Sequence, residues 1–292
     1  MGHKVVHFFS EGSKIEGELF TPEGMRAGER RPGIVLCHGY SGVRELILPD
    51  YAKRFLAAGF VALTFDYRGF GGSEGPEKGR IIPLEQIDDI RNALTFLELQ
   101  PEVDPDRMGL WGTSFGGFHA PYTAGVDTRV KAAVAQVGGG NGESLLMDIR
   151  NEAERKALLE LLAEDRKSRV LTGKGTAGDT ATILASPQTR EFFEMALPHY
   201  PNLKSDIPWE SAEKTLQYRP IDVVDRIAPR ALMLIGAVDD DLCKIEGYRE
   251  LIARAKEPKK LVELPITHYQ IYQPEWVEVS ANHAIEWFTK YL

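Results

Sequence analysis

The sequence contains few cysteines and no cluster of cysteine and histidine residues. Of its 292 residues only Cys37 and Cys243 are cysteines. Two cysteines cannot form the disulfide framework of a small secreted protein, and no Cys/His spacing matches a zinc site. We therefore expect neither a disulfide-stabilised fold nor a bound metal.

The sequence also lacks long hydrophobic runs and basic runs. No stretch reaches the roughly 18 uninterrupted apolar residues of a membrane span. The first residues, MGHKVVHFFSEG, lack the apolar core of a signal peptide. Acidic residues outnumber basic ones by 43 to 35, for a net charge of −8. Because an acidic chain without a basic patch binds nucleic acid poorly, we expect a cytoplasmic protein with neither nucleic acid nor membrane as partner.

Short apolar runs alternate with helical patterns along most of the chain. Eight runs have the character of strands: 5–9, 14–20, 33–37, 61–65, 108–111, 132–137, 231–235 and 260–264. The helical patterns are 46–58, 84–99, 115–124, 247–255 and 276–291. Buried runs separated by helices are typical of a parallel sheet covered on both faces. We predict an α/β fold with a mostly parallel eight-stranded sheet, helices on both faces and a hairpin of the first two strands at one edge.

Residues 141–213 interrupt this alternation. They hold no convincing strand, and they contain the charged amphipathic stretch SLLMDIRNEAERKALLELLAEDRKSR followed by an aromatic segment. A long excursion between two sheet strands usually carries function or forms a subdomain. We predict a helical cap at 141–213, inserted into a core domain formed by 1–140 and 214–292. Its aromatic residues, including Phe193 and Trp209, either line a substrate pocket or dock the cap onto the core.

The stretch LWGTSFGGFHA, residues 110–120, places Ser114 between Gly112 and Gly116. A predicted strand ends just before Ser114 and a predicted helix begins just after it. Glycines on both sides indicate a tight turn that side chains would obstruct. Such a turn lifts the hydroxyl above the edge of the sheet, beside the positive end of the helix dipole. The pattern therefore predicts a nucleophilic serine.

A nucleophilic serine needs a base, and the base needs a third group that holds its tautomer. Of the seven histidines, His268 follows the last predicted strand in LVELPITHYQIY, where a loop can hold the imidazole over the sheet edge. The preceding strand ends in LMLIGAVDDDL, which offers three consecutive aspartates. The spacing from the end of this strand favours Asp239 as the third group, with Asp240 and Asp241 as alternatives.

The ordered motifs LCHGYSG, FDYRGFGGSEG, GTSFGG, IGAVDDDL and PITHY resemble those of the α/β-hydrolase family over nearly the whole chain. Within the family they are most similar to the dienelactone hydrolase, acetyl-xylan esterase and cocaine-esterase-like acyl hydrolases. The family's order of nucleophile, acid and histidine matches Ser114, Asp239 and His268. The oxyanion loop departs from one lipase and esterase group, because it reads HGYSG rather than HGGG.

The resemblance also implies an oxyanion hole and a role for His38. The backbone N–H groups of Tyr40 and Phe115 would hold the developing oxyanion, while His38 would shape the loop. The glycine-rich RGFGGSEG at 68–75 has no Lys-Ser/Thr pair after it, so it does not match a phosphate-binding loop.

These observations predict a serine hydrolase that cleaves a carboxylic ester of a small-molecule acyl substrate without a cofactor. The same triad serves amidases, peptidases, thioesterases, lactonases, acyltransferases and carbon–carbon hydrolases, and these alternatives stay open. A ligand-binding receptor on a hydrolase scaffold is the alternative outside enzymes. The sequence also leaves a homo-oligomer open.

Overall fold

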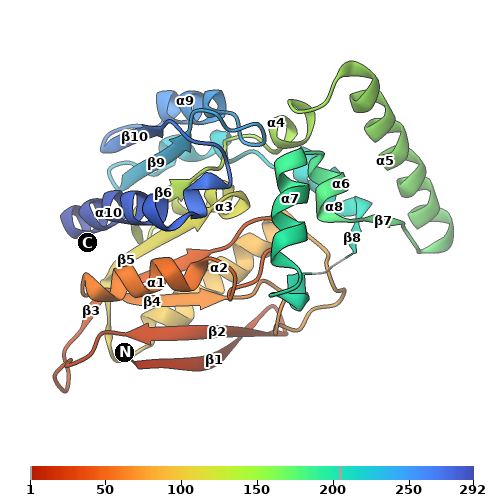
Figure 1. Ribbon diagram of the computed structural model, residues 1–292. Helices are drawn as coiled ribbons and strands as arrows, with labels where there is room; N and C mark the ends of the chain where they lie inside the picture. The colour runs from red at the N-terminus through yellow and green to blue at the C-terminus, as the bar shows by residue number, and fades with distance from the viewer. Residues whose placement is uncertain (1, 204–205) are drawn as a thin grey trace.

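The computed structural model describes residues 2–203 and 206–292, and its centre is a twisted eight-stranded sheet (Figure 1). The strands lie in the order β1-β2-β4-β3-β5-β6-β9-β10. Pairing is antiparallel from β1 to β4 and parallel across the rest of the sheet. The strands are β1 (Gly2–Ser10), β2 (Ser13–Thr21), β3 (Arg31–Cys37), β4 (Val61–Phe65), β5 (Val103–Thr113), β6 (Val130–Gln136), β9 (Ala231–Ala237) and β10 (Lys259–Leu264). The predicted fold class and the predicted edge hairpin are confirmed.

The central strands are mostly apolar along their buried parts because they face a core on each side. Every residue of β4 and β9 is buried. Along β3, Ile34 and Leu36 point into one core, while Val35 and Cys37 point into the other. Alternation along a strand therefore separates apolar side chains between two faces, rather than between a core and solvent.

Helices cover both faces of the sheet (Figure 1). On one face α1 (Leu48–Ala57) and α10 (Pro274–Tyr291) pack over a core that includes Trp111 and Phe288. On the other face lie α2 (Pro83–Glu98), α3 (Phe115–Val126) and α9 (Ile245–Arg254), over the core that includes Leu110 and Leu234. Short 3₁₀ turns occur at Pro201–Leu203, Pro220–Asp222, Val224–Arg226 and Gln270–Tyr272.

The chain between β6 and β9 is mostly helical, as Figure 1 shows in green. It contains α4 (Gly142–Met147), α5 (Glu152–Thr172), α6 (Thr180–Leu184), α7 (Pro187–Ala196) and α8 (Trp209–Leu216). It also contains one short antiparallel pair, β7 (Ala177–Gly178) and β8 (Ile207–Pro208), which the sequence did not predict. Buried leucines of α4 and α5 belong to the same core as α2 and α3. The division into a core domain and a cap therefore stays a prediction.

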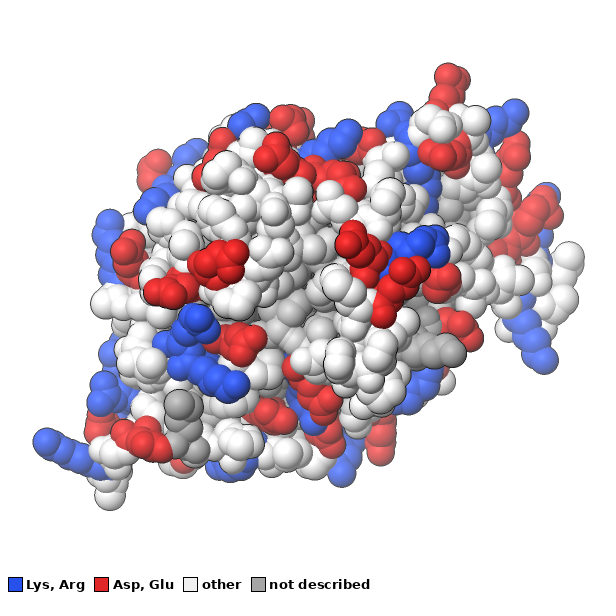
Figure 2. All heavy atoms as spheres, viewed as in Figure 1, with Lys and Arg blue, Asp and Glu red and all other residues white. Residues whose placement is uncertain are grey.

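The surface carries charges of both signs. On the face in Figure 2, acidic and basic side chains are interspersed. In the described ranges, no helix combines the length and the apolar character that a membrane crossing requires.

Candidate active site

Ser114 lies in a strained turn between β5 and α3. Its backbone has φ 54° and ψ −120°, which is rare for a residue with a side chain. An added Cβ at Gly112 would overlap the carbonyl of Gly116, and one at Gly116 would overlap the carbonyl of Cys37. The two glycines are needed because backbone segments pass each other here without room for a side chain. The Ser114 N–H donates to the carbonyl of Gln136 at 2.9 Å, which fixes the turn to β6.

His268 lies between Ser114 and an aspartate. Its Nε2 is 3.1 Å from Ser114 Oγ, and its Nδ1 is 2.7 Å from Asp240 Oδ2. The imidazole is fully buried. A carboxylate beside Nδ1 holds the ring proton there, which leaves the Nε2 lone pair free to accept the serine proton. The arrangement can therefore generate a serine nucleophile.

The structure corrects the predicted acid, because Asp240 contacts His268 and Asp239 does not. The chain stays paired with the His268 loop after β9 ends: Val238 N–H donates to the carbonyl of Leu264 at 2.8 Å, and Asp239 N–H donates to that of Ile266 at 3.0 Å. The chain therefore turns one residue later than the sequence suggested. Asp239 lies exposed in a turn, whereas the next residue, Asp240, is buried and points to the histidine.

Asp240 is held from both sides. Its Oδ1 accepts the backbone N–H groups of Leu242 at 2.9 Å and Cys243 at 2.7 Å, while Oδ2 faces His268. Such bonds stabilise an ionised carboxylate and fix its orientation. Burial and the charge of Asp240 raise the pKa of the neighbouring Asp241. The loop after β9, residues 238–244, thus presents one oriented carboxylate to His268, and we call it the acid loop.

The predicted oxyanion loop passes directly against the nucleophile. An added Cβ at Gly39 would lie 3.0 Å from Ser114 Cβ. In residues 2–203 and 206–292, neither the Tyr40 N–H nor the Phe115 N–H has a hydrogen-bond partner. The rings of Tyr40 and Phe115 pack edge to face, with centroids 5.1 Å apart. Two unpartnered N–H groups beside Ser114 are compatible with an oxyanion hole, which stays a prediction.

A narrow apolar pocket of about 40 Å³ opens beside Ser114. Its walls come from the oxyanion loop, from α7 and from the loop after His268, and they include Val43, Leu46, Phe192, Phe193, Tyr269 and Tyr272. No described wall residue is an aspartate, glutamate, lysine or arginine. Sequence reasoning missed Tyr269 and Tyr272, although they lie one and four residues after His268 in HYQIY. The pocket suits an uncharged group.

The two aromatic residues singled out in the insertion have different surroundings. Phe193 lines the pocket beside Ser114, and its role in binding substrate stays a prediction. Trp209 is 8% exposed and packs its ring against Gly178, and it does not line that pocket. The structure therefore places Trp209 away from the pocket beside Ser114, and a role of this residue in binding substrate stays a prediction.

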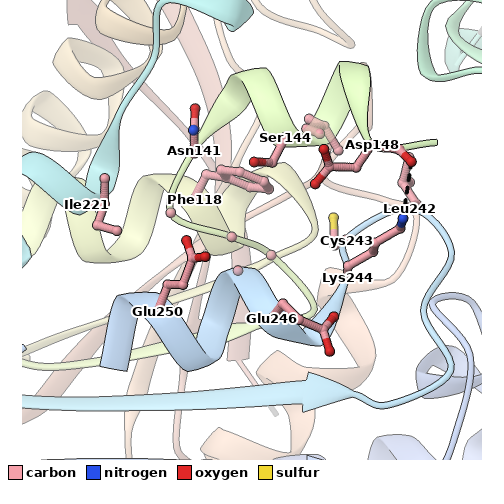
Figure 3. A pocket seen from close by; sticks show the side chains of 15 residues that line it. Phe118, Asn141, Ser144, Asp148, Ile221, Leu242, Cys243, Lys244, Glu246 and Glu250 are labelled. Atoms are coloured by element: carbon pink, nitrogen blue, oxygen red, sulfur yellow. Dashed lines mark hydrogen bonds between the residues drawn. The ribbon is translucent and has the colours of Figure 1, made fainter. Parts of the chain in front are cut away.

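A larger cavity of about 210 Å³ borders the acid loop at Leu242, Cys243 and Lys244 (Figure 3). Phe118, Asn141, Ser144, Cys243 and Glu250 contribute to its lining. Lys244 Nζ crosses its rim and donates to the carbonyl of Asp148 at 3.1 Å. Ser114 does not border this cavity but lines the smaller pocket, so we place the candidate site in the smaller pocket.

Cys243 brings a potential metal ligand near the triad. One ligand atom each of Asp240, Cys243 and His268 lie within 4.8 Å of one another. The Asp240 oxygens and both nitrogens of His268 already take part in hydrogen bonds. Burial also holds the pKa of the Cys243 thiol well above its ordinary value, which disfavours the thiolate that binds metals. The donor set therefore fits a hydrogen-bonded triad better than a metal centre.

His38 and His119 are buried and form hydrogen bonds outside the contact between Ser114 and His268. His38 is buried, its Nδ1 is 3.0 Å from the carbonyl oxygen of Gly39, and burial lowers its pKa. His119 lies between Tyr218 Oη and Gln86 Oε1, each at 3.0 Å, and burial lowers its pKa to about 3. Neither contacts the Ser114 hydroxyl.

Comparison with known proteins agrees with this geometry. The model of the alpha/beta hydrolase family matches residues 34–285. An uncharacterized 31.7 kDa protein in the traX-finO intergenic region of Escherichia coli is 36% identical over 98% of both chains. The thiohydrolase aneE of Aspergillus aculeatus is 26% identical, over 86% of this chain and 81% of its own.

Among solved structures, the alpha/beta hydrolase GrgF from Penicillium sp. sh18 is 26% identical. It superposes with a TM-score of 0.83 and covers 100% of this chain and 99% of its own. The sheet order and the strained turn at Ser114 are consistent with the match to the family model. The chain therefore belongs to the α/β-hydrolase family.

Proposed function

We propose that this protein is a serine hydrolase that cleaves a carboxylic ester through an acyl-enzyme. The observation that carries the proposal is the continuous contact from Ser114 Oγ to His268 Nε2, at 3.1 Å, and from His268 Nδ1 to Asp240 Oδ2, at 2.7 Å. A nucleophile, a base and a group that orients the base stand in the order that acyl transfer needs. The family match supports a hydrolase.

In the first half of the reaction, Ser114 Oγ attacks the carbonyl carbon of the ester while its proton passes to His268 Nε2. The negative charge that develops on the carbonyl oxygen is held by the N–H groups of Tyr40 and Phe115. Asp240 stabilises the imidazolium that forms. The tetrahedral intermediate then collapses, and His268 gives its proton to the departing alcohol.

In the second half, water attacks the acyl-enzyme. His268 Nε2 accepts a proton from this water, and the same two N–H groups hold the second oxyanion. Collapse returns the proton to Ser114 Oγ and releases the carboxylic acid. Every proton is exchanged between Ser114, His268, the alcohol and water, so these residues need no further reactant.

A thioester is the second candidate substrate, because one relative is a thiohydrolase. The apolar pocket beside Ser114 suits the acyl part of either substrate. Turnover of matched esters and thioesters that share one acyl group decides between them. We expect the oxygen ester to have the higher kcat/KM, and a large excess of thioester turnover would favour the second candidate.

Replacement of the nucleophile tests the chemistry itself. We expect Ser114→Ala to lower kcat by about 10⁴- to 10⁶-fold, since the remaining groups cannot form an acyl-enzyme. Ser144→Ala is the matched control, because Ser144 borders the larger cavity outside the proposed site. A Ser114→Ala protein that keeps a tenth of the wild-type activity would overturn the proposal.

A further inference from the structure

Three buried hydroxyl groups in the insertion contact loops of the proposed active site. They belong to Thr180, Ser186 and Thr189, and their exposed fractions are 4%, 2% and 0%. Each contacts the residue that directly follows a member of the proposed machinery: Thr180 contacts Ser41, Ser186 contacts Asp241, and Thr189 contacts Tyr269. In the sequence, these three partners come directly after Tyr40, Asp240 and His268, respectively. One segment, residues 180–189, therefore contacts all three loops.

The contact at the oxyanion loop is short and fully enclosed. The hydroxyl oxygens of Ser41 and Thr180 lie 2.6 Å apart, and Ser41 is 2% exposed. Ser41 has φ 51°, a conformation that is unfavourable for a non-glycine residue and persists only where the surroundings hold it. Tyr40, whose N–H we assign to the oxyanion hole, is the adjacent residue. The Thr180 hydroxyl thus helps to hold this N–H in place.

The contact at the histidine loop joins α7 to the ring beside His268. Tyr269 Oη donates to Thr189 Oγ1 at 2.8 Å. The Tyr269 ring stacks on Phe192, with centroids 4.5 Å apart, and meets the His268 ring edge to face at 4.8 Å. The hydroxyl and the aromatic stack together fix the ring against which the imidazole packs.

The contact at the acid loop is longer. Ser186 Oγ caps α7 by accepting the N–H of Thr189 at 3.2 Å, and it lies 3.4 Å from Asp241 Oδ2. At 3.4 Å this hydrogen bond is weaker than the other two, which measure 2.6 and 2.8 Å. Its position is nonetheless consistent with theirs, since α7 begins at the acid loop and continues over the histidine loop.

We propose that Thr180 and Thr189 are positioning residues, which hold the oxyanion loop and His268 in their reactive geometry. The proposal rests on the proposed function and deepens it. Its consequence is that the insertion contributes to the rate of the chemical step and not only to the choice of substrate. A displacement of about 1 Å in a reacting group can cost about 100-fold in rate, so two hydroxyl groups remote from the substrate can matter.

The test removes each hydroxyl group without changing the shape of the side chain. We expect Thr180→Val and Thr189→Val to lower kcat for a small ester by about 10- to 100-fold, with KM changed by less than about threefold. Thr180→Ser and Thr189→Ser keep the hydroxyl and should recover most of the activity. Thr182→Val is the matched control, because Thr182 is an exposed residue of α6. Equal kcat in all three valine variants would overturn the proposal.

A second variant covers the case in which Thr180→Val does not fold. Ser41→Ala removes the same hydrogen bond from the other side, so we expect a loss of kcat of similar size. In the double variant the two losses should not add, because both single changes break one bond. Fully additive losses would contradict a shared role.

Hydrogen exchange separates this proposal from the proposed function, because it needs no activity. We expect amides in residues 38–44 to exchange faster in Thr180→Val, and those in residues 266–272 to exchange faster in Thr189→Val, than in Thr182→Val. A wild-type protein that turns over neither esters nor thioesters would refute the proposed function alone. Unchanged exchange in both loops would refute the positioning role, whatever the activity.

Discussion

The three consecutive aspartates after β9 have three different environments. Asp239 is exposed, Asp240 is buried and bonded through both oxygens, and Asp241 is half-buried with a raised pKa. These differences follow from the turn after β9, which leaves Val238 and Asp239 exposed and directs Asp240 toward His268. Only the middle carboxylate can reach His268 Nδ1.

We expect Asp240→Asn to lower kcat for an ester by about 10⁴-fold at neutral pH, because an amide at this position favours the wrong tautomer of His268. Asp239→Asn is the matched control and should cost less than about tenfold, since the Asp239 side chain faces solvent. Steady-state kinetics of the two variants checks this. A collapse in Asp239→Asn with near-normal Asp240→Asn would contradict the observed geometry.

The sequence could predict the meeting of Ser114 and His268, but not the correct aspartate. Both residues follow predicted parallel strands, and the carboxyl ends of such strands share one edge of the sheet. The choice among aspartates depends on how far pairing continues beyond β9. That depends on hydrogen bonds to Leu264 and Ile266, which local sequence does not encode.

At the scale of elements, α7 forms one wall of the pocket beside Ser114. Phe192 and Phe193 face the pocket, and a small hydrophobic cluster with Val43, Ala196 and Leu203 joins α7 to the oxyanion loop. This cluster is separate from the two cores that cover the sheet. The helix therefore sets the shape of the pocket through a few contacts of its own.

Shortening a pocket residue of α7 should change the choice of acyl group. We expect Phe193→Ala to alter KM across esters of increasing acyl length more than it alters kcat on the smallest ester, because the acyl chain contacts this wall. Kinetics over a series of acyl lengths measures both quantities. A uniform loss of kcat with KM unchanged would contradict the assignment.

Trp209→Ala provides the contrast within the same insertion. Trp209 is buried away from the pocket, so we expect a loss of about 3–5 kcal/mol in the free energy of unfolding and no selective effect on acyl length. Denaturant unfolding measures the loss. Retained stability together with an altered preference for acyl length would indicate that Trp209 contacts the substrate.

Elements of regular length could be predicted, whereas the shortest ones could not. Strands such as β4 and β9 are continuous buried runs of mostly apolar residues, and the helix at 274–291 has a clear apolar face. The pair β7 and β8 has two residues in each strand, which is too short to show alternation. Pairing between such segments is decided by tertiary packing.

At the scale of the whole molecule, buried polar groups link parts of the chain that are distant in sequence. His119 of α3 contacts Gln86 of α2 and Tyr218, which follows α8. Its imidazole is fully buried, and burial lowers its pKa from 6.5 to about 3. Electrostatic repulsion from the nearby His38 acts in the same direction but is the smaller cause.

This histidine should make stability depend on pH. As pH falls below 6.5, the unfolded chain binds a proton at His119 while the folded protein does not. The free energy of unfolding should therefore decrease by about 1.4 kcal/mol per pH unit from pH 6 to 4. We expect His119→Gln to remove this contribution, so that its stability falls less steeply over the same range. Parallel curves for both proteins in denaturant unfolding would contradict the buried, neutral imidazole.

Covalent labelling tests most directly whether Ser114 is an activated nucleophile. A fluorophosphonate reacts with a serine hydroxyl only where a base accepts its proton and an oxyanion site receives the phosphoryl oxygen. Intact-mass measurement should show one adduct per chain, and peptide mapping should place it on Ser114. Ser114→Ala should stay unlabelled, and Ser144→Ala should label like the wild type. An unlabelled wild-type protein, or an adduct on another residue, would contradict the proposed chemistry.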